Sequence, residues 1–439
     1  MEWYVTLLIL FGGLIVLLAS GLPVAFAFLL FNVIAAFVLW GGQIGLQQLT
    51  LSITSSVANF TLLPVPLFML MGEVMYQTGI APQMMDALDK WLGRVPGRLS
   101  LLAVGAGVIL STLTGTTMAS TAMLGSVLVP EMEKRGYKKE MSLGPIMGSG
   151  GLAIMIPPSA VAVILGALSG ISIGGILIGI IVPGLVMAVI FAAYILLRCR
   201  LQPSLAPLYE VASASLSEKL SATLRYIAPL GLVVFLVTGV IMVGLATPSE
   251  AAATGALGTF ILAAIYRKLN WTVVKKAMVG TINISVMVLM LITGAKAFSQ
   301  VLAYTGASQG LVEVATGLSL SPIFILLGMI AVVLFLGMFV DLTAIMLITL
   351  PLFMPIVKVL GFNPVWYAVV LMLCMEMSTI TPPFGMVLFT MKGVAPPSTT
   401  MGDIYKAALP FVACDCVAVA LIILFPALAL WLPGLMVLR

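Results

Sequence analysis

Long apolar runs, separated by short polar loops, fill almost the whole sequence of 439 residues. Hydrophobic residues make up 62% of the chain and charged residues 8%, whereas soluble domains carry about 25% charged residues. Such a chain cannot cover its surface with polar groups, so a soluble globular fold is excluded. At ~20 residues per crossing, the runs predict an all-α polytopic membrane protein. The chain has no histidine, which excludes histidine-based catalysis and argues against an enzyme.

The apolar runs predict ten full crossings. They are expected at 4–19, 22–41, 51–78, 141–166, 174–197, 226–245, 250–266, 277–306, 364–391 and 407–432. The first run has no basic flank and no small-residue cleavage site, so it is expected to stay as a span.

Two further apolar segments, 99–130 and 323–355, are expected to be re-entrant hairpins. The first lies between two loops rich in Lys and Arg, which the positive-inside rule places together in the cytoplasm. Each arm of about 16 residues reaches only ~24 Å, short of a hydrocarbon core of ~30 Å. One long tilted helix is the alternative, and it would place one basic loop outside.

A pattern of proline and glycine from the first half of the chain recurs in the second half at a nearly constant offset. Pro130 matches Pro355, and the proline pair 157–158 matches 382–383. The loops of the first set are basic, whereas their counterparts in the second set nearly lack Lys and Arg. Equivalent loops should therefore lie on opposite sides of the membrane. This predicts two inverted-topology repeats with both termini outside, an arrangement typical of secondary transporters with a site near the midplane.

The expected domain organisation follows from these repeats. It comprises N-terminal scaffold helices at 1–63, a first repeat at 64–200 with hairpin 99–130 and broken helix 141–166, a linker and scaffold helices at 201–288, and a second repeat at 289–439 with hairpin 323–355 and broken helix 364–391.

Four polar breaks interrupt the apolar segments, at the two expected hairpin tips and the two proline pairs. They cover 111–121, 148–159, 337–343 and 378–385. Proline frees backbone carbonyls, which together with hydroxyls can coordinate Na⁺, while half-helix N-termini attract an anionic substrate group. A proline kink with hydroxyls bonded to their own helix explains a single break equally well. Four breaks in repeat-related pairs favour a binding site.

Acidic residues inside a membrane are costly, which makes each one a candidate for function. Asp341 at the second tip is the best acidic candidate for cation coordination or for shaping the tip. Glu376 either packs the second proline break or contacts a ligand. Glu250 is expected to cap a helix N-terminus. Glu73 and Lys296 occupy nearly equivalent repeat positions, so a buried pair between the halves is a further option.

Four segments, in order, resemble the large membrane subunit of TRAP (tripartite ATP-independent periplasmic) transporters. They are PEMEKRGY at 130–137, GGLAIMIPPS at 150–159, TPSEAAA at 247–253 and TPPFGMVLF at 381–389. The resemblance covers essentially the whole chain. It implies a Na⁺-driven importer of organic acids in the bacterial inner membrane, with an elevator transport domain moving against a scaffold. It also implies two partners, a small DctQ-like membrane subunit and a periplasmic substrate-binding protein.

Together, the breaks and the resemblance give two sets of candidate residues. The Na⁺ candidates are Ser111, Thr114, Thr116, Ser120, Ile156, Pro157, Gly337, Asp341, Thr379 and Thr381. The substrate candidates are Thr117, Gly150, Pro158, Ser159, Pro382, Pro383 and Gly385. No other cofactor and no nucleic-acid partner is expected, because the net charge of +5 sits in short loops.

Two alternatives and the choice of substrate remain open. One alternative is a stand-alone Na⁺/dicarboxylate symporter, and the other is a proton-coupled carrier that uses Asp341 or Glu376. The first tip is rich in Thr, where members of the family often carry Ser and Ala. No Arg lies in the expected cavity, so no bidentate carboxylate clamp is indicated. Sialic acids, C4-dicarboxylates, keto acids and sulfonates all remain candidates.

Overall fold

The chain is helical throughout the part that the structure, a computed structural model, describes. That part covers residues 2–114, 116–209, 214–317 and 319–436, without the side chains of 19 and 111–114. It contains no strand, so the expectation of an all-α protein is confirmed. Seven of its helices are long and apolar enough to cross a membrane, or up to eight if one bent pair is a single span. The figure of ten crossings stays a prediction.

The N-terminal region holds four helices and corrects one expected span. They are α1 (Trp3–Ala19), α2 (Val24–Leu39), α3 (Gln43–Val57) and α4 (Pro64–Gln77). The continuous helix expected over 51–78 is interrupted, because α3 ends at Val57; the stretch that is long and apolar enough to cross a membrane is Phe60–Gln77. Asn59 accepts a hydrogen bond from the Thr61 N–H and caps the 3₁₀ turn η1 (Phe60–Leu62). Pro64 then starts α4, since the first turn of a helix does not need its missing N–H.

The first hairpin and the first broken helix follow the short helix α5 (Ala81–Asp89). The hairpin consists of α6 (Arg98–Thr114) and α7 (Thr117–Lys134), which pack against each other. The next span is divided into α8 (Lys139–Met155) and α9 (Ala160–Ser169), with a bend of 47°. The division expected at the first proline pair is therefore present.

The middle of the chain contains α10 (Ile173–Gly179), α11 (Ile181–Leu201), α13 (Ala228–Met242) and α14 (Pro248–Ile265). Between α11 and α13 lie the turn η2 (Pro203–Leu205), the helix α12 (Leu216–Ala222) and the π turn η3 (Thr223–Ile227). The expected linker, 201–222, is thus partly helical. Its helix begins where Ser215 and Glu218 form a capping box, which satisfies two free N–H groups.

The second half begins with the 34-residue helix α15 (Trp271–Tyr304). It continues with α16 (Ala307–Gly317), α17 (Pro322–Gly337), α18 (Leu342–Val359), α19 (Pro364–Thr379), α20 (Met386–Val394), α21 (Met401–Leu424) and α22 (Ala427–Gly434). The starts of α18 and α19 follow the starts of α7 and α8 at one common offset, the same offset that relates the two proline pairs. The order hairpin, then broken helix, therefore occurs in both halves.

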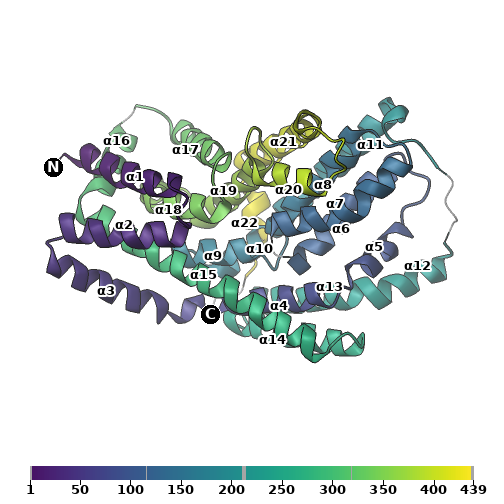
Figure 1. The fold of residues 1–439 in the computed structure, drawn as a ribbon, viewed down its shortest axis with the longest axis horizontal. Helices are drawn as coiled ribbons and strands as arrows, with labels where there is room; N and C mark the ends of the chain where they lie inside the picture. The colour runs from purple at the N-terminus through teal and green to yellow at the C-terminus, as the bar shows by residue number, and fades with distance from the viewer. Residues whose placement is uncertain (1, 115, 210–213, 318, 437–439) are drawn as a thin grey trace.

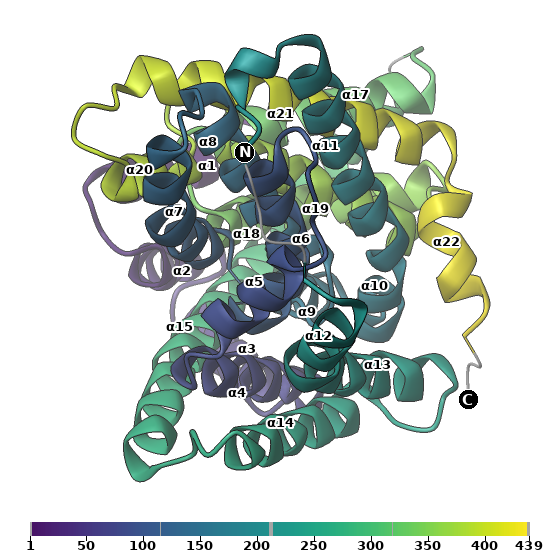
Figure 2. The same ribbon diagram turned by 90° about the vertical axis from the view of Figure 1, so that its right-hand side faces the viewer.

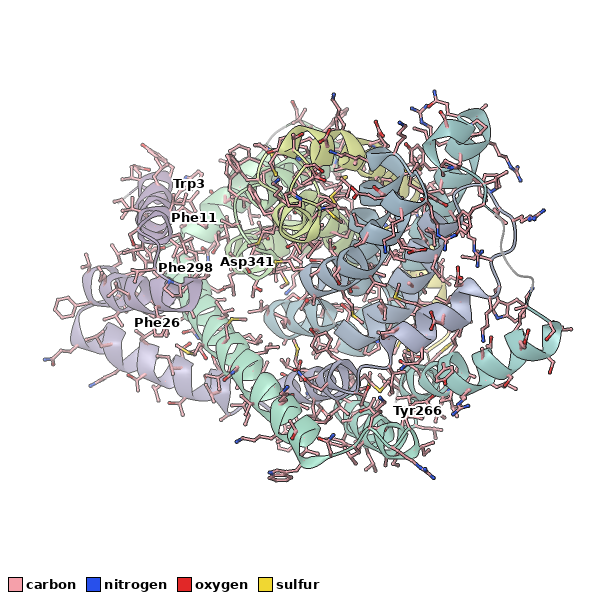
Figure 3. All side chains as sticks on the ribbon, turned by 45° about the vertical axis from the view of Figure 1, so that its right-hand side comes forward. Trp3, Phe11, Phe26, Tyr266, Phe298 and Asp341 are labelled. Carbon is pink, nitrogen blue, oxygen red and sulfur yellow. The ribbon has the colours of Figure 1, made fainter. Side chains whose placement is uncertain are left out.

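Two groups of helices build the molecule. In both views α4, α13 and α14 lie along one side, beneath the bundle that contains α6–α8 and α19–α21 (Figures 1 and 2). The long helix α15 runs obliquely across the molecule (Figure 1). It packs on α2, α3 and α4 as well as on α9 and α18. Phe298 of α15 anchors the N-terminal helices: its ring lies 5.4 Å from that of Phe11 (Figure 3) and 5.6 Å from that of Phe28.

Candidate functional site

Each proline pair separates two helices and frees backbone acceptors. The breaks lie between α8 and α9 and between α19 and α20. Because proline has no N–H, the carbonyls four residues earlier lose their helical donors. These carbonyls belong to 153–154 in α8 and to 378–379 in α19. The Ser378 carbonyl accepts instead from the Thr381 N–H at 3.2 Å. Among the described residues, the liberation of carbonyls expected from the sequence is therefore complete at the first break and partial at the second.

The tip of the first hairpin packs against α8, just ahead of the first break. A Cβ on Gly150 would collide with the Thr121 hydroxyl and would lie 3.3 Å from the Thr117 carbonyl oxygen. Thr116 caps α7 by accepting from the Ala119 N–H at 3.3 Å. Thr117, Ser120 and Thr121 are buried. The structure thus brings the candidates Thr116, Thr117, Ser120 and Gly150 into one region. The side chains of Ser111 and Thr114 lie outside the description.

The tip of the second hairpin packs against α19 in the same way. A Cβ on Gly337, the last residue of α17, would collide with the Ser378 hydroxyl. Asp341 caps α18, and its carboxylate accepts from the N–H groups of Thr343 at 3.0 Å and Ala344 at 3.4 Å. Asp341 lies within the body of the molecule (Figure 3). It shapes the tip in this structure, and its role as a Na⁺ ligand stays a prediction.

The hydroxyls near the second break bond to their own helix. Ser378 donates to the Met375 carbonyl at 2.6 Å, Thr379 to Glu376 at 2.7 Å and Thr381 to Met377 at 2.7 Å. This is the local bonding that the simple kink explanation requires. It is also compatible with a cation site, because a hydroxyl that donates its proton retains lone pairs.

The remaining candidates lie in the two loops of the breaks. In the first loop Ile156 is half-buried, while Pro157, Pro158 and Ser159 are buried. Ser159 caps α9 by accepting from the Ala162 N–H at 3.3 Å.

In the second loop Pro382 is half-buried, Pro383 is exposed and Gly385 is buried. The Gly385 N–H donates to the Thr381 carbonyl at 3.2 Å. The Tyr405 hydroxyl of α21 donates to the Pro383 carbonyl at 2.7 Å, so a neighbouring helix also holds the loop in place.

An internal pair of acids lies behind the second break, and sequence reasoning did not find it. The Glu376 carboxyl occupies the space that a Cβ on Gly151 would need. It lies against the carboxyl of Asp415 of α21, and both acids are buried. Among the described residues neither carboxyl has a hydrogen-bond partner in its ionised form. A signal was available, since Gly151 and Glu376 are related by the same offset as the two proline pairs. Asp415 carried no such signal.

Two other expectations about charged residues have clear outcomes. Glu73 lies beside Gly280, sixteen residues before Lys296 on α15. At 1.5 Å per residue that is ~24 Å along the helix, so the suggested Glu73–Lys296 pair is not formed. The expected cap at Glu250 is confirmed, because Glu250 and Thr247 form a capping box at the start of α14.

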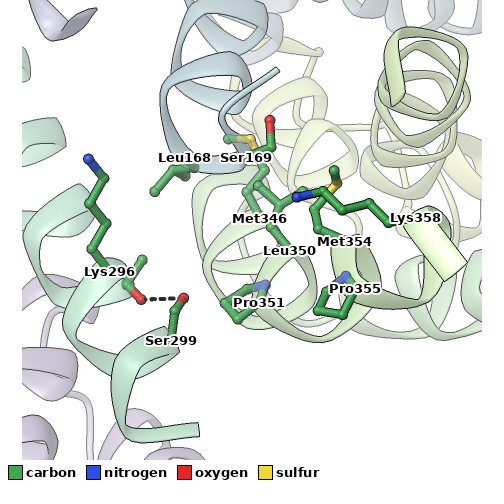
Figure 4. Close-up of a pocket in the computed structure, with 11 residues that line it drawn as sticks. Leu168, Ser169, Lys296, Ser299, Met346, Leu350, Pro351, Met354, Pro355 and Lys358 are labelled. Carbon is green, nitrogen blue, oxygen red and sulfur yellow. Dashed lines mark hydrogen bonds between the residues drawn. The ribbon is translucent and has the colours of Figure 1, made fainter. Parts of the chain in front are cut away.

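Two adjoining cavities lie beside α9, and the sequence did not predict them. The larger, of about 970 Å³, is lined by η1 and the start of α4, the end of α9 and the start of α14. The smaller, of about 320 Å³, lies between α9, α15 and α18 (Figure 4). Both have Leu168, Ser169 and Lys296 in their walls. Their sizes fall in the range of roughly 300–1,000 Å³ of small-molecule sites.

The fold and these sites define a class, a polytopic membrane protein with two hairpins and two broken helices, as found in secondary transporters. The particular family follows from comparison with known proteins. Residues 11–428 match the family "Tripartite ATP-independent periplasmic transporter, DctM component". The chain belongs to this family, the large membrane subunit of TRAP transporters. It is a multi-pass inner-membrane transport protein rather than an enzyme.

Curated relatives agree with this assignment over most of their length. The chain is 30% identical to the C4-dicarboxylate TRAP transporter large permease protein DctM of Pseudomonas aeruginosa, covering 88% of this chain and 90% of that one. It is also 30% identical to the 2,3-diketo-L-gulonate TRAP transporter large permease protein YiaN of Escherichia coli, covering 92% and 93%. Among solved structures, the YdaH transporter of Alcanivorax borkumensis matches with a TM-score of 0.67 at 18% identity, over 90% of both chains. That likeness concerns the fold alone.

Proposed function

We propose that this chain is the permease subunit of a Na⁺-coupled, binding-protein-dependent importer of small organic acids, either carboxylates or sulfonates. One observation carries the proposal. Each hairpin tip packs against the broken helix of its own half, with Thr121 on Gly150 in the first unit and Gly337 on Ser378 in the second. Hydroxyls, freed carbonyls and helix ends therefore meet twice in one molecule, as a paired ion site requires.

Na⁺ is the coupling ion that the oxygen groups at the two hairpin tips and the two breaks favour. The first site would draw on the tip at 111–120 and the carbonyls of 156–157. The second would draw on Gly337, Asp341 and the loop 379–381. These groups offer neutral oxygens and one carboxylate, which suit a hard cation. Coupling requires that Na⁺ bind the loaded carrier better than the empty one, because an ion without differential affinity shifts no equilibrium.

Transport would proceed by an elevator movement of one group of helices against the other. The bundle of the two hairpins and two broken helices would be the mobile domain, and α1–α4 with α13–α15 the scaffold. The inverted repeats, with both termini on the periplasmic side, would supply its two end states. A small DctQ-like subunit and a periplasmic binding protein would complete the transporter. The Pseudomonas aeruginosa relative is named for C4-dicarboxylates and the Escherichia coli relative for 2,3-diketo-L-gulonate, which supports an acidic substrate.

Uptake into proteoliposomes tests this proposal against the stand-alone symporter. The vesicles would contain this chain with its small subunit, and the variables would be an inward Na⁺ gradient and the purified cognate binding protein. We expect uptake only when both are present. Uptake with Na⁺ alone would favour the stand-alone symporter, and uptake driven by a pH gradient without Na⁺ would favour the proton-coupled carrier.

A further inference from the structure

The smaller cavity beside α9 carries positive charge, and none of the described residues in its wall is acidic. The wall contains Lys296 from α15 and Lys358 from the end of α18. The other lining residues are apolar or carry a hydroxyl. Figure 4 shows Lys296 on the α15 side and the Lys358 side chain extending toward Ser169 and Met346. The cavity is therefore a positively charged space between α15, on one side, and the hairpin and broken helix, on the other.

Lys296 lies in the C-terminal third of α15, a helix long and apolar enough to cross a membrane. It is half-buried, with eight further residues of α15 before the helix ends at Tyr304. Among the residues that the structure describes, neither Lys296 nor Lys358 forms an ion pair. Ionisable residues inside membranes normally pair or line a watery path, because an isolated charge there is costly. Both cavities give the Lys296 side chain open space in which an anion could pair with it.

The adjoining larger cavity contains an acid, but that acid is already engaged. Of the described residues in its wall, Glu250 is the sole carboxylate and Lys296 the only basic group. The Glu250 carboxylate accepts from the Thr247 N–H and the Thr247 hydroxyl, each at 2.8 Å. It also lies at the N-terminus of α14, whose partial positive charge compensates it. Glu250 therefore does not pair with Lys296.

We propose that Lys296 is an anion-binding residue that contacts the carboxylate or sulfonate of the substrate between α9, α15 and α18, with Lys358 extending the positive field. This inference rests on the proposed function and names the scaffold residue that selects for negative charge. A lysine ammonium is a point charge that accepts an anionic group without the fixed fork geometry of arginine. Lys296 on α15 would thus select for an anion, and the hairpin tips would discriminate among different anions.

Charge-selective labelling of a cysteine in the cavity tests the inference without transport. In a background with all four native cysteines replaced, Ser169→Cys would place a thiol in the wall common to both cavities. The negatively charged reagent sulfonatoethyl methanethiosulfonate is itself a small sulfonate. Trimethylammonioethyl methanethiosulfonate is its cationic counterpart. The measurement is the labelling rate with each reagent, using the purified protein in detergent.

We expect Lys296→Gln to lower the rate with the sulfonate about fivefold and to raise the rate with the cation similarly. A unit charge acting over a distance of ~8 Å at an effective dielectric constant of ~40 would produce an effect of this size. Lys296→Arg should preserve both rates, and Lys358→Gln should produce a smaller change of the same sign. At a control cysteine placed at Ser217, on the exposed face of α12, Lys296→Gln should change neither rate.

Two results would overturn the inference. One is an unchanged ratio of the two rates in Lys296→Gln. The other is a thiol at Ser169→Cys that reacts with neither reagent, which would show that the cavity does not admit an anion. Because labelling needs no Na⁺ gradient, binding protein or transported substrate, its failure is separable from failure of the proposed function. Loss of Na⁺-dependent uptake with an intact charge effect would reject the proposed coupling alone.

Discussion

The two hairpin and broken-helix units, α6–α9 and α17–α20, share one order of elements but differ in charge and exposure. The first tip is capped by a neutral threonine, Thr116, and the second by Asp341. The first loop buries Pro158 and Ser159, whereas the second loop leaves Phe384 52% exposed. In the proposed Na⁺ sites, the first unit would therefore offer a cation only neutral oxygens in an enclosed place. The second has a formal negative charge beside a more open loop.

This difference suggests distinct roles for two sites of common design. A carboxylate at the second tip attracts a cation more strongly than hydroxyls do, and its open loop gives an ion easier access. The first site, lacking a formal charge, depends more on the closure of its hairpin tip against α8. We expect the second site to determine the affinity for Na⁺. Na⁺ binding at the first site should depend on closure of its hairpin tip against α8.

The largest predicted effect concerns the seam between the units, where Gly151 of α8 faces Glu376 of α19. Gly151→Ala places a methyl group in the space of the Glu376 carboxyl. We expect a loss of about 1–3 kcal/mol, the usual range for overpacking, seen as a lower Tm of the purified protein. Gly12→Ala on α1, where no atom lies within 4 Å of the added Cβ, is the matched control.

A second substitution tests whether the seam causes this loss. Glu376→Ala should restore part of the Tm lost in Gly151→Ala, because it removes the colliding group. Equal and additive losses in the double variant would show that the two residues do not interact, and would contradict the description of the seam.

The next largest effect is expected when the negative charge at the second hairpin tip is removed. Asp341→Asn keeps a side chain that can cap α18 but removes the carboxylate. We expect the Na⁺ concentration for half-maximal uptake to rise about tenfold, equivalent to about 1.4 kcal/mol, with little change in Tm. Thr116→Ser, which retains the neutral cap of α7, should leave that concentration nearly unchanged. Equal effects of both changes would remove the proposed difference between the sites.

A smaller effect is expected at the first loop. Ser159→Ala removes the cap of α9, which costs about 1 kcal/mol, and it also removes an oxygen from the first site. The Na⁺ concentration at half-maximal uptake should rise by more than a stability loss of that size would produce. It should also rise less than in Asp341→Asn. An unchanged Na⁺ dependence in a folded Ser159→Ala protein would exclude a contribution of this loop to ion binding.

The smallest effect is predicted at the N-terminal end of α8. Lys139 pairs with Asp403 of α21 at 2.9 Å, and both side chains are about one-third exposed. Solvent screens such pairs, so Lys139→Ala should reduce stability by no more than ~1 kcal/mol. The Tm difference from the wild type should shrink as salt is raised. A large, salt-independent loss would mean that this contact, rather than the seam at Gly151, holds the two halves together.

Local patterns predicted the breaks between helices well, because proline and glycine act on their own neighbourhood. The re-entrant course of the two hairpins stays a prediction. Pro157 and Pro382 ended helices where expected, and Thr247 with Glu250 formed the expected cap. Hydropathy placed the start of the span at 51–78 too early, since an average over apolar residues does not register the start signals at Asn59 and Pro64. Residues that meet only in three dimensions were missed. Lys296 and Lys358 line one cavity from different helices, and Asp415 reaches Glu376 from a separate helix far along the chain.

The most direct test of the central claim is the Na⁺ dependence of thermal stability, measured at constant ionic strength with K⁺ as the replacement. A ligand that binds only the folded state raises Tm in a saturable way. The account predicts saturable stabilisation by Na⁺ over K⁺ in the purified wild type. It predicts partial loss in Asp341→Asn and in Ser159→Ala, and near-complete loss when the two are combined. Equal stabilisation by Na⁺ and K⁺, or an undiminished Na⁺ effect in the double variant, would contradict it.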